Sequence, residues 1–569
     1  MKRLLTVCLT VILILSAIPI GLFGITASAV IDGYFSYFAV NGKARIVDVD
    51  PTISGSVTVP RFFLGYWVTH IDKRAFADCT EITDITIPEN IMCVGEEAFA
   101  GCTGIKSVTI EKDTTQIGGS AFLDCTGLTT VNFNVEESLF VGTAKKPAFS
   151  GCTALTTVNI GSNAKNVPAY MFADCENLTT VNLSDSVTSI GDFAFSGCTQ
   201  LKNITVPQGV TSIGDGAFSG CSSLETLNFN ATECATFGSQ CAPVFKDCSA
   251  LTTVNIGHNV KTIPDYAFLK CSALNSISVP DSVGIIGNYA FSECCAIKSV
   301  TIGNNVSRIG NYAFSGCFAL SKIAVPDSTV HVGDAAFFDC VGLKTVTLGN
   351  RITSINRNAF AKCQALTDII IPNSVSFIGN RAFSDCTALK SINIPSNVKT
   401  IESEAFSGCT GLEHVSFNAI NCTNMGTAEA PVFKGCSSLR TVSIGKDVKT
   451  IPSYAFAGCT GLKSVTVPDN VTSIKKGAFY GCDDVVYESP KEKQHESIPE
   501  SSSEEIKNES EETSSTEVFD EIEYEWVEDV PDTKKPPITL YVIIAVVSAL
   551  LIAGVVVLII LYKKDRVEL

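Results

Sequence analysis

A Phe-x-x-Cys signature, usually preceded by Ala, recurs eighteen times between Phe76 and Cys482 and constrains the fold more than any other feature. Fourteen of the seventeen steps between successive signature Phe residues are 23 residues long, and three are 27. Repeats of this length are typical of solenoids, in which each coil buries its apolar side chains only against its neighbours. We therefore expect residues 71–487 to form one stack of eighteen coils.

Within one coil, the pattern predicts a short strand followed by turns. In residues 294–317, Val300 and Ile302 alternate with polar residues, which is typical of a strand with one buried face. A Gly-Asn-Asn turn follows, and Val306 and Ile309 are then expected to point inward. The expected fold class is an α/β repeat solenoid, a curved array of short parallel strands joined by turns and short helical segments.

The N-terminal residues predict a secreted chain with a capped solenoid. A basic start, an apolar run and the Ala27-Ser28-Ala29 pattern indicate a signal peptide over residues 1–29. Residues 30–70 are expected to form a cap. Its first part is a hairpin across Asn41-Gly42, a strong two-residue turn signal, and a degenerate first coil follows.

The C-terminal residues predict a stalk and an anchor. Residues 488–533 carry seventeen Asp or Glu and three Lys, so residues 488–537 are expected to be an acidic, disordered stalk. Residues 538–562 are apolar throughout and predict a transmembrane helix, followed by a basic cytoplasmic tail at 563–569. The chain would then be a single-pass protein of the cell surface. Residues 530–534 leave sortase attachment to a cell wall as an alternative.

The coil sequence is similar to a known repeat. Phe-Ala-Gly-Cys-Thr-Gly-Leu-Lys-Ser-Val-Thr-Val-Pro-Asp, which begins at Phe456, resembles the BspA-type leucine-rich repeats of bacterial surface proteins. The resemblance covers about residues 34–482 and implies a leucine-rich-repeat solenoid with a parallel sheet on one face, whose role is adhesion to extracellular proteins or other cells. The Cys precedes the strand instead of following it, so the buried Asn ladder of other leucine-rich repeats is not carried over.

The chain has 24 cysteines, eighteen of them in the signature. Equivalent positions on successive coils lie about 4.8 Å apart, but their Cα–Cβ bonds run parallel, which is unsuitable for a disulfide. We expect the signature cysteines to be reduced, buried and small apolar fillers. Outside the signature, Cys234 and Cys241 share one long loop, and pairing between them remains open.

Two groups of residues are candidates for binding. The outward strand position forms a polar row without aromatic side chains, and the 27-residue coils carry longer loops at 134–147, 230–243 and 418–431. The polar row could equally be a ladder that suits an exposed sheet, and the loops could be relics of duplication. The candidates are Asn159, Asn182, Thr205, Asn228, Asn255 and Thr301 in the row, and Phe140, Phe237 and Met425 in the loops.

No pattern predicts catalysis or a cofactor. The five histidines show no metal-ligand spacing, and no phosphate loop or nucleophile elbow is present in the sequence. The row has no base-stacking aromatics, so nucleic acid is not an expected partner. The leading hypothesis is a non-enzymatic bacterial surface protein that adheres to an extracellular protein or cell-surface ligand. A glycan-binding surface protein and a structural envelope spacer are the alternatives.

Overall fold

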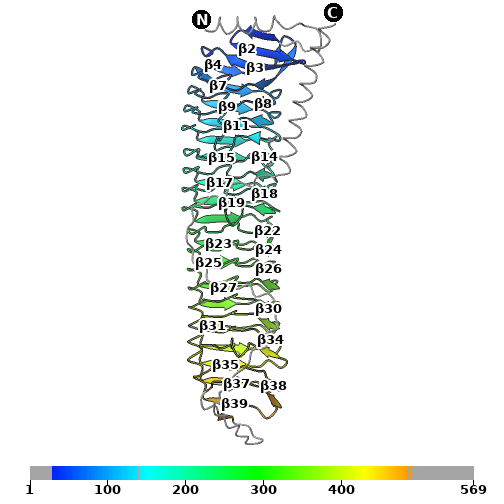
Figure 1. The fold of residues 1–569 in the computed structure, drawn as a ribbon, viewed down its shortest axis with the longest axis vertical. Helices are drawn as coiled ribbons and strands as arrows, with labels where there is room; N and C mark the ends of the chain where they lie inside the picture. The colour runs from blue at the N-terminus through cyan, green and yellow to red at the C-terminus, as the bar shows by residue number, and fades with distance from the viewer. Residues whose placement is uncertain (1–27, 139, 483–485, 488–569) are drawn as a thin grey trace, which may run out of the picture. The chain divides into compact units, whose positions relative to one another are not determined.

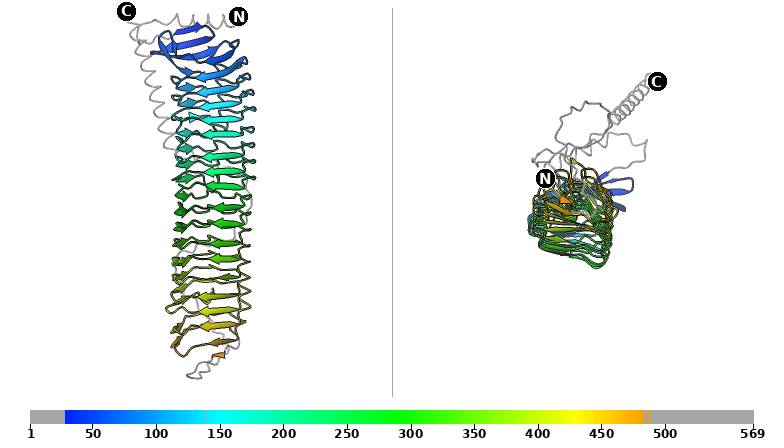
Figure 2. Two further views of the ribbon diagram at one scale, coloured as in Figure 1. Left: turned by 180° about the vertical axis from the view of Figure 1, so that it is seen from behind. Right: turned by 90° about the horizontal axis from the view of Figure 1, so that it is seen from below.

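The computed structural model describes residues 28–138, 140–482 and 486–487. They belong to the first of two compact units, Met1–Gln494, and form a column of stacked coils that Figure 1 shows from the blue N-terminal end to the gold C-terminal end. The views in Figure 2 show that successive coils lie almost directly above one another. Each coil has a first face with the longer strands, a second face with two-residue strands, and a turn face made by the Phe-x-x-Cys segment.

The cap precedes the regular coils. Its strands are β1 (Ser28–Asp32), β2 (Phe35–Val40), β3 (Lys43–Val49), β4 (Gly55–Thr58), β5 (Phe62–Phe63) and β6 (Tyr66–Ile71). Strands β2 and β3 pair antiparallel across Asn41 and Gly42, which both have positive φ, as a type I′ turn requires. Strand β4 pairs in parallel with the first face and β6 with the second, so the first coil begins inside the cap.

The first face contains the strands that sequence alternation predicts. They are β7 (Ile82–Ile87), β9 (Ser107–Ile110), β11 (Thr130–Phe133), β13 (Thr157–Ile160), β15 (Thr180–Leu183), β17 (Asn203–Val206), β19 (Thr226–Phe229), β21 (Thr253–Ile256), β23 (Ser276–Ser278), β25 (Ser299–Thr301), β27 (Lys322–Ala324), β29 (Thr345–Thr347), β31 (Asp368–Ile369), β33 (Ser391–Ile394), β35 (His414–Phe417), β37 (Thr441–Ile444), β39 (Ser464–Thr466) and β41 (Val486–Tyr487). Most neighbouring strands pair in parallel and in register, as in Asn132 opposite Asn159, and the pairing is interrupted after β15, β21, β25 and β31.

The second face was not predicted as a strand ladder. Its strands are β8 (Cys93–Val94), β10 (Gln116–Ile117), β12 (Phe140–Val141), β14 (Asn166–Val167), β16 (Ser189–Ile190), β18 (Ser212–Ile213), β20 (Thr236–Phe237), β22 (Thr262–Ile263), β24 (Ile285–Ile286), β26 (Arg308–Ile309), β28 (His331–Val332), β30 (Ser354–Ile355), β32 (Phe377–Ile378), β34 (Thr400–Ile401), β36 (Asn424–Met425), β38 (Thr450–Ile451) and β40 (Ser473–Ile474). Two residues are too few to show an alternation, and these strands exist because they pair with the coils above and below.

The signature phenylalanines form one continuous stack through the core. The rings of successive signature Phe residues lie face to face, with centroid separations between 4.7 Å for Phe76–Phe99 and 6.3 Å for Phe245–Phe268. The inward Val and Ile residues of both faces and the signature cysteines are also buried against this stack. The core is therefore a column in which each coil completes the packing of the next.

The expected helical segments are absent from the part of the chain that the structure describes, which contains only strands and turns. The reason lies in the turn face, where left-handed residues stand four positions apart, as with Tyr312 and Gly316 at φ 55° and 71°. A right-handed helix cannot propagate through such residues. The expected curvature is also slight in Figure 1, because strands of equal spacing occupy both faces of the coil.

The predicted membrane anchor lies outside the described residues. Among the residues that are described, no helix is long and apolar enough to cross a bilayer. Residues 1–27 of the signal peptide predicted over 1–29, the stalk at 488–537, the span at 538–562 and the tail at 563–569 are likewise not described and stay predictions. The last two residues of that predicted peptide, Ser28 and Ala29, begin strand β1.

Candidate functional site

The polar row of the first face forms side-chain ladders. The amide nitrogen of Asn182 donates to Asn159 Oδ1 (2.8 Å), that of Asn159 to Asn132 Oδ1 (2.8 Å), and that of Asn132 to Thr109 Oγ1 (3.2 Å). Each inner Asn therefore uses both its amide nitrogen and its amide oxygen to link three coils. This arrangement supports the stability of the stack, and it leaves these amides less available to a ligand.

A second ladder lies further along the row. Asn255 donates to Asn228 Oδ1 (2.9 Å), and Asn228 donates to Thr205 Oγ1 (3.1 Å). Thr205 also lines a hollow of about 280 Å³ together with His258. Thr301 is exposed on β25. The structure thus joins five of the six row candidates into two ladders and does not gather all six into one site.

The aromatic and sulfur candidates of the long loops are not at the surface. Phe237 and Met425 are 2% and 1% exposed, because each is the inward residue of a second-face strand. The expectation that these two side chains are exposed in loops is therefore wrong. The backbone of Phe140 pairs with Gln116 in the equivalent strand β12, while its side chain lies outside what the structure describes.

The four extra residues of each long coil are divided between two places. An ordinary coil is 23 residues long. Strand pairing aligns Ile117 with Val141, 24 residues later, whereas the signature residues Phe122 and Phe149 are 27 residues apart. One extra residue therefore precedes the second-face strand and three follow it. The same division holds for the other two long coils, where Phe237 pairs with Ile213 and Met425 with Ile401.

The inserted residues change the turn that leads back to the core. In the long coils Pro147, Pro243 and Pro431 occupy the position two before the signature Phe, where most other coils have a left-handed residue. Proline cannot adopt positive φ. The left-handed turn is displaced upstream to the Gly that follows each strand, namely Gly142, Gly238 and Gly426 at φ 51°, 54° and 62°.

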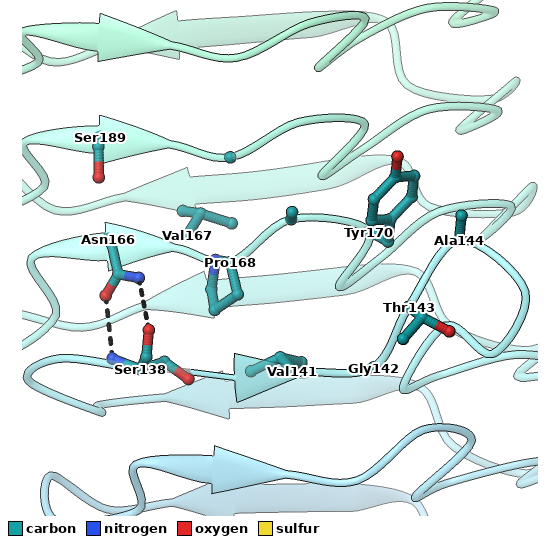
Figure 3. Close-up of a pocket in the computed structure, with 12 residues that line it drawn as sticks. Ser138, Val141, Gly142, Thr143, Ala144, Asn166, Val167, Pro168, Tyr170 and Ser189 are labelled. Carbon is teal, nitrogen blue, oxygen red and sulfur yellow. Dashed lines mark hydrogen bonds between the residues drawn. The ribbon is translucent and has the colours of Figure 1, made fainter. Parts of the chain in front are cut away.

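A hollow lies between the first long coil and the coil after it (Figure 3). Its volume is about 380 Å³, and its walls include Gly142 and Ala144 of the insertion and Pro168 and Tyr170 of the next coil. Asn166 fixes the rim, because Asn166 Nδ2 donates to the carbonyl oxygen of Ser138 (3.1 Å) and Ser138 N donates to Asn166 Oδ1 (3.2 Å). The twelve described residues that line this hollow carry no charged side chain.

The second long coil forms an equivalent hollow. Its volume is about 560 Å³, and Gly238, Pro264 and Tyr266 stand at the positions of Gly142, Pro168 and Tyr170. This hollow differs in its charges, since Glu233, Lys261 and Asp265 line it as well. Tyr and Pro are thus the shared wall, and the charged rim belongs to the second hollow.

A Pro-x-Tyr motif follows each long coil and no other coil in the sequence: Pro168-Ala169-Tyr170, Pro264-Asp265-Tyr266 and Pro452-Ser453-Tyr454. Most other coils have Gly at the Pro position. A Cβ on Gly191 would lie 2.5 Å from the backbone nitrogen of Ala169, and one on Gly310 would lie 2.5 Å from the carbonyl carbon of Gly287. Next to a long coil, the hollow takes the place of this close contact between Gly and the preceding backbone, so the ring of the motif proline fits. Sequence reasoning missed the motif, although its coincidence with the 27-residue steps could have revealed it.

The tyrosines of the motif stack on the coil that follows them. The ring of Tyr170 lies 5.3 Å from that of Phe193, and the ring of Tyr266 lies 5.3 Å from that of Tyr289. Burial raises the pKa of Tyr170, and the carboxylates of Asp192 and Asp215 raise it further, so its hydroxyl stays protonated at neutral pH. Each tyrosine therefore offers a fixed aromatic wall and a hydroxyl donor.

The cysteines are thiols throughout the described residues, and no disulfide joins any of them. Cys234 is buried and donates to the carbonyl oxygen of Thr236 (3.3 Å), whereas Cys241 is exposed. Cys422 donates to the carbonyl oxygen of Asn424 (3.5 Å) in the equivalent turn. Cys234 and Cys422, which both lie outside the signature, therefore stabilise the turn that precedes the second-face strand. Within the described residues, no group of three or more His, Cys, Asp or Glu is placed to hold a metal ion.

The repeats match the model of the BspA type leucine rich repeat region (6 copies) over residues 58–144, 141–242, 241–367 and 353–486. The chain belongs to the BspA-type leucine-rich-repeat family. A comparison with curated protein sequences finds no match.

Several solved structures are similar to this BspA-type chain. A leucine-rich repeat protein from Bacteroides ovatus is 22% identical, with 83% of this chain and 100% of that chain covered and a TM-score of 0.44. A leucine rich cell surface protein from Faecalibacterium prausnitzii is 25% identical over 77% of this chain and 94% of that one, at a TM-score of 0.31. The pneumococcal vaccine antigen PcpA is 15% identical over 81% and 99%, at a TM-score of 0.29. The family assignment rests on the repeat model.

The cap of this BspA-type protein carries an exposed apolar hairpin, which we call the cap hairpin, made by β5, β6 and the turn between them. Phe62 and Trp67 are 52% and 49% exposed, and their ring centroids are 3.8 Å apart. Phe63, one residue further, is buried and stacks on Tyr37 at 3.9 Å. The hairpin is therefore fixed to the core on one side and presents aromatic rings on the other.

The tip of the cap hairpin is strained as well as apolar. Leu64 has φ 46° and is 73% exposed, and Gly65 follows at φ 83°. A turn with positive φ at both central residues strongly favours Asn or Gly at the first position, and a bulky residue is unusual there. Leu64 thus places an apolar side chain in solvent at a position that a polar residue would fit better.

Proposed function

We propose that this chain is a non-enzymatic cell-surface protein that binds a partner protein outside the cell through its cap hairpin. The observation that supports the proposal is the grouping of Phe62, Leu64, Tyr66 and Trp67, all exposed, within six residues of one rigid turn. Large exposed apolar patches are uncommon on soluble surfaces and accompany interaction sites. Trp and Tyr are also the residues most enriched at the energetic centres of protein interfaces.

The position of the cap hairpin suits the binding of a partner protein. The hairpin lies at the blue, N-terminal end of the column, where it can be reached without passing the other coils (Figure 1). The rings of Phe62 and Trp67 are already paired, so little side-chain entropy is lost when a partner covers them.

The test uses cells that display the full-length chain, applied to separately immobilised, purified extracellular-matrix proteins. If the proposal holds, one protein binds saturably, and a Phe62→Ala/Trp67→Ala double variant lowers the affinity at least about 10-fold, as loss of an interface centre does. Ile370→Ala is the matched control, because Ile370 is an exposed apolar residue on the distant first face. Retention of binding by the double variant, or an equal loss in the control, would contradict the proposal. If the chain binds only to other copies of itself, the cap hairpin is a self-interaction surface and the proposal of a partner protein is contradicted.

A further inference from the structure

We propose that the hollows next to the long coils are binding sites for the pyranose rings of an oligosaccharide. This goes beyond the partner-protein function, because the hollows lie on the second face and are formed by residues that the cap hairpin does not contain. Both hollows, at about 380 and 560 Å³, fall within the range of roughly 300–1,000 Å³ that is usual for small-molecule sites.

The shared wall determines the class of ligand. In each hollow a tyrosine and a proline line the wall beside the glycine of the displaced turn, so both hollows share an aromatic and apolar section of wall. A pyranose presents an apolar face of C–H groups and a rim of hydroxyls, which matches an aromatic wall surrounded by hydrogen-bonding groups. The tyrosine is held by its stack on the next coil, so its orientation is set before a ligand binds.

The polar groups of the first hollow fit a neutral ligand. Ser138, Thr143, Asn166 and Ser189 line it, and they supply hydroxyl and amide groups but no charge. The Ser138 Oγ atom is shielded and has no hydrogen-bond partner among the described residues. A buried polar atom without a partner is unfavourable. A charged peptide finds no counter-charge here.

Two changes occur together in the sequence. The three residues inserted after the strand belong to one coil, and the Pro-x-Tyr motif belongs to the next. The insertions lie in the fourth, eighth and sixteenth coils, and the motif follows each of them. The first two sites are four coils apart, which is about 19 Å at the usual strand spacing. Sites on one face at this spacing can engage successive segments of one polysaccharide, which raises the overall affinity without a new contact.

The experiment measures equilibrium binding of defined probes to the full-length chain in a detergent without a sugar headgroup. The probes are maltoheptaose, cellohexaose and chitohexaose as neutral oligosaccharides, and a proline decamer as the competing peptide class. We expect at least one oligosaccharide to bind saturably at two or more sites per chain. A Tyr170→Ala/Tyr266→Ala double variant should weaken binding at least 10-fold, and Tyr454→Ala should remove any remaining site.

Tyr312→Ala is the matched control. Tyr312 occupies the same position of its coil and stacks on Tyr289 at 4.7 Å, but it does not follow a long coil. It should leave oligosaccharide binding unchanged, and Tyr170→Phe should retain most of it. The proposal is overturned if none of the three oligosaccharides binds, if only the proline decamer binds, or if Tyr312→Ala weakens binding as much as the double variant. Loss of partner-protein binding in the cap variant with intact sugar binding would separate the two proposals.

Discussion

The thiol of Cys102 donates a hydrogen bond to the carbonyl oxygen of Phe76 (3.0 Å) and so links one coil to the coil before it. The same carbonyl oxygen accepts the backbone amide of Cys79 within its own coil (3.2 Å). The contact recurs along the column, as between Cys317 and Phe291 at 3.3 Å. The signature Cys is therefore a hydrogen-bond donor between coils as well as a small buried side chain, and a disulfide would remove that donor.

The first prediction concerns the oxidation state of the signature cysteines. Alkylation of the denatured chain without reductant should modify the described signature cysteines from Cys79 to Cys459, because they are thiols in the structure. In the native chain Cys241 should react first, since it is exposed, and buried residues such as Cys317 should be protected. Mass spectrometry of the labelled peptides measures both. Signature cysteines that stay unmodified after denaturation would show that they are paired.

The second prediction concerns alkaline pH. Burial raises the pKa of Cys271 from its ordinary value of 9.0 to about 12, and that of Cys175 to about 12 by burial and the carboxylate of Asp174. In the unfolded chain these thiols ionise near pH 9, whereas in the folded chain they stay protonated. Their contribution to stability is complete below pH 9 and is lost as the pH rises toward 12, at about 1.4 kcal/mol per pH unit for each thiol.

Urea unfolding followed at pH 8, 9, 10 and 11 checks this dependence. The midpoint should be constant up to about pH 8.5 and then fall steeply, because several buried thiols contribute together. A Cys271→Ala variant should be less stable at pH 8 but should show a smaller slope above pH 9. Equal slopes for the variant and the natural chain would contradict the assignment.

The third prediction concerns the phenylalanine stack. The ring of Phe291 lies 5.2 Å from Phe268 and 5.2 Å from Phe314 and is fully buried. Phe291→Ala should lower the free energy of unfolding by about 3–5 kcal/mol, because it leaves a cavity that the adjacent coils cannot fill. Phe318→Ala is the control, since Phe318 is exposed and its loss should change stability by less than about 0.5 kcal/mol. Thermal unfolding of both variants measures the difference.

The fourth prediction separates support from binding in the polar row. Asn159→Ala removes the hydrogen bonds to Asn132 and from Asn182 and should destabilise the chain by about 1–3 kcal/mol, at roughly 0.5–1.5 kcal/mol for each bond. Thr301→Ala, at the equivalent position of an exposed strand, should have a smaller effect. Urea unfolding measures stability, and the matrix-protein assay measures binding. Lost binding at unchanged stability would favour a ligand role for Asn159.

The fifth prediction concerns the strained tip of the cap hairpin. Leu64→Asn should stabilise the chain by up to about 1 kcal/mol, because Asn tolerates the left-handed conformation, while it weakens partner binding. Leu64→Ala should weaken binding without that gain in stability, since Ala keeps the unfavourable φ. Thermal unfolding and the cell-display assay report the two effects. Stronger partner binding by Leu64→Asn would contradict the role of Leu64.

Part of the candidate site could be predicted and part could not. The 27-residue steps identified the three long coils correctly from the sequence. Phe237 and Met425 were assigned to loops because a two-residue strand such as β20 leaves no alternation, and pairing with Ile213 buries Phe237. The place of Tyr170 and Tyr266 beside the hollows could not be predicted, because each hollow is formed by residues of consecutive coils, whereas the sequence pattern shows only which residues share one coil.

The sequence by itself determined the period, the first-face strands, the inward Val and Ile residues and the buried Phe and Cys, because these follow from a local pattern that repeats. Only the tertiary structure decided the second-face strands, the carbonyl partner of Cys102, the left-handed residues that prevent helices, and the exposure of Trp67. Each of these depends on contacts with a neighbouring coil or, for Trp67, on how the cap strands β3 and β5 pair with β6. In a solenoid such contacts lie about 23 residues away, beyond the range of local periodicity.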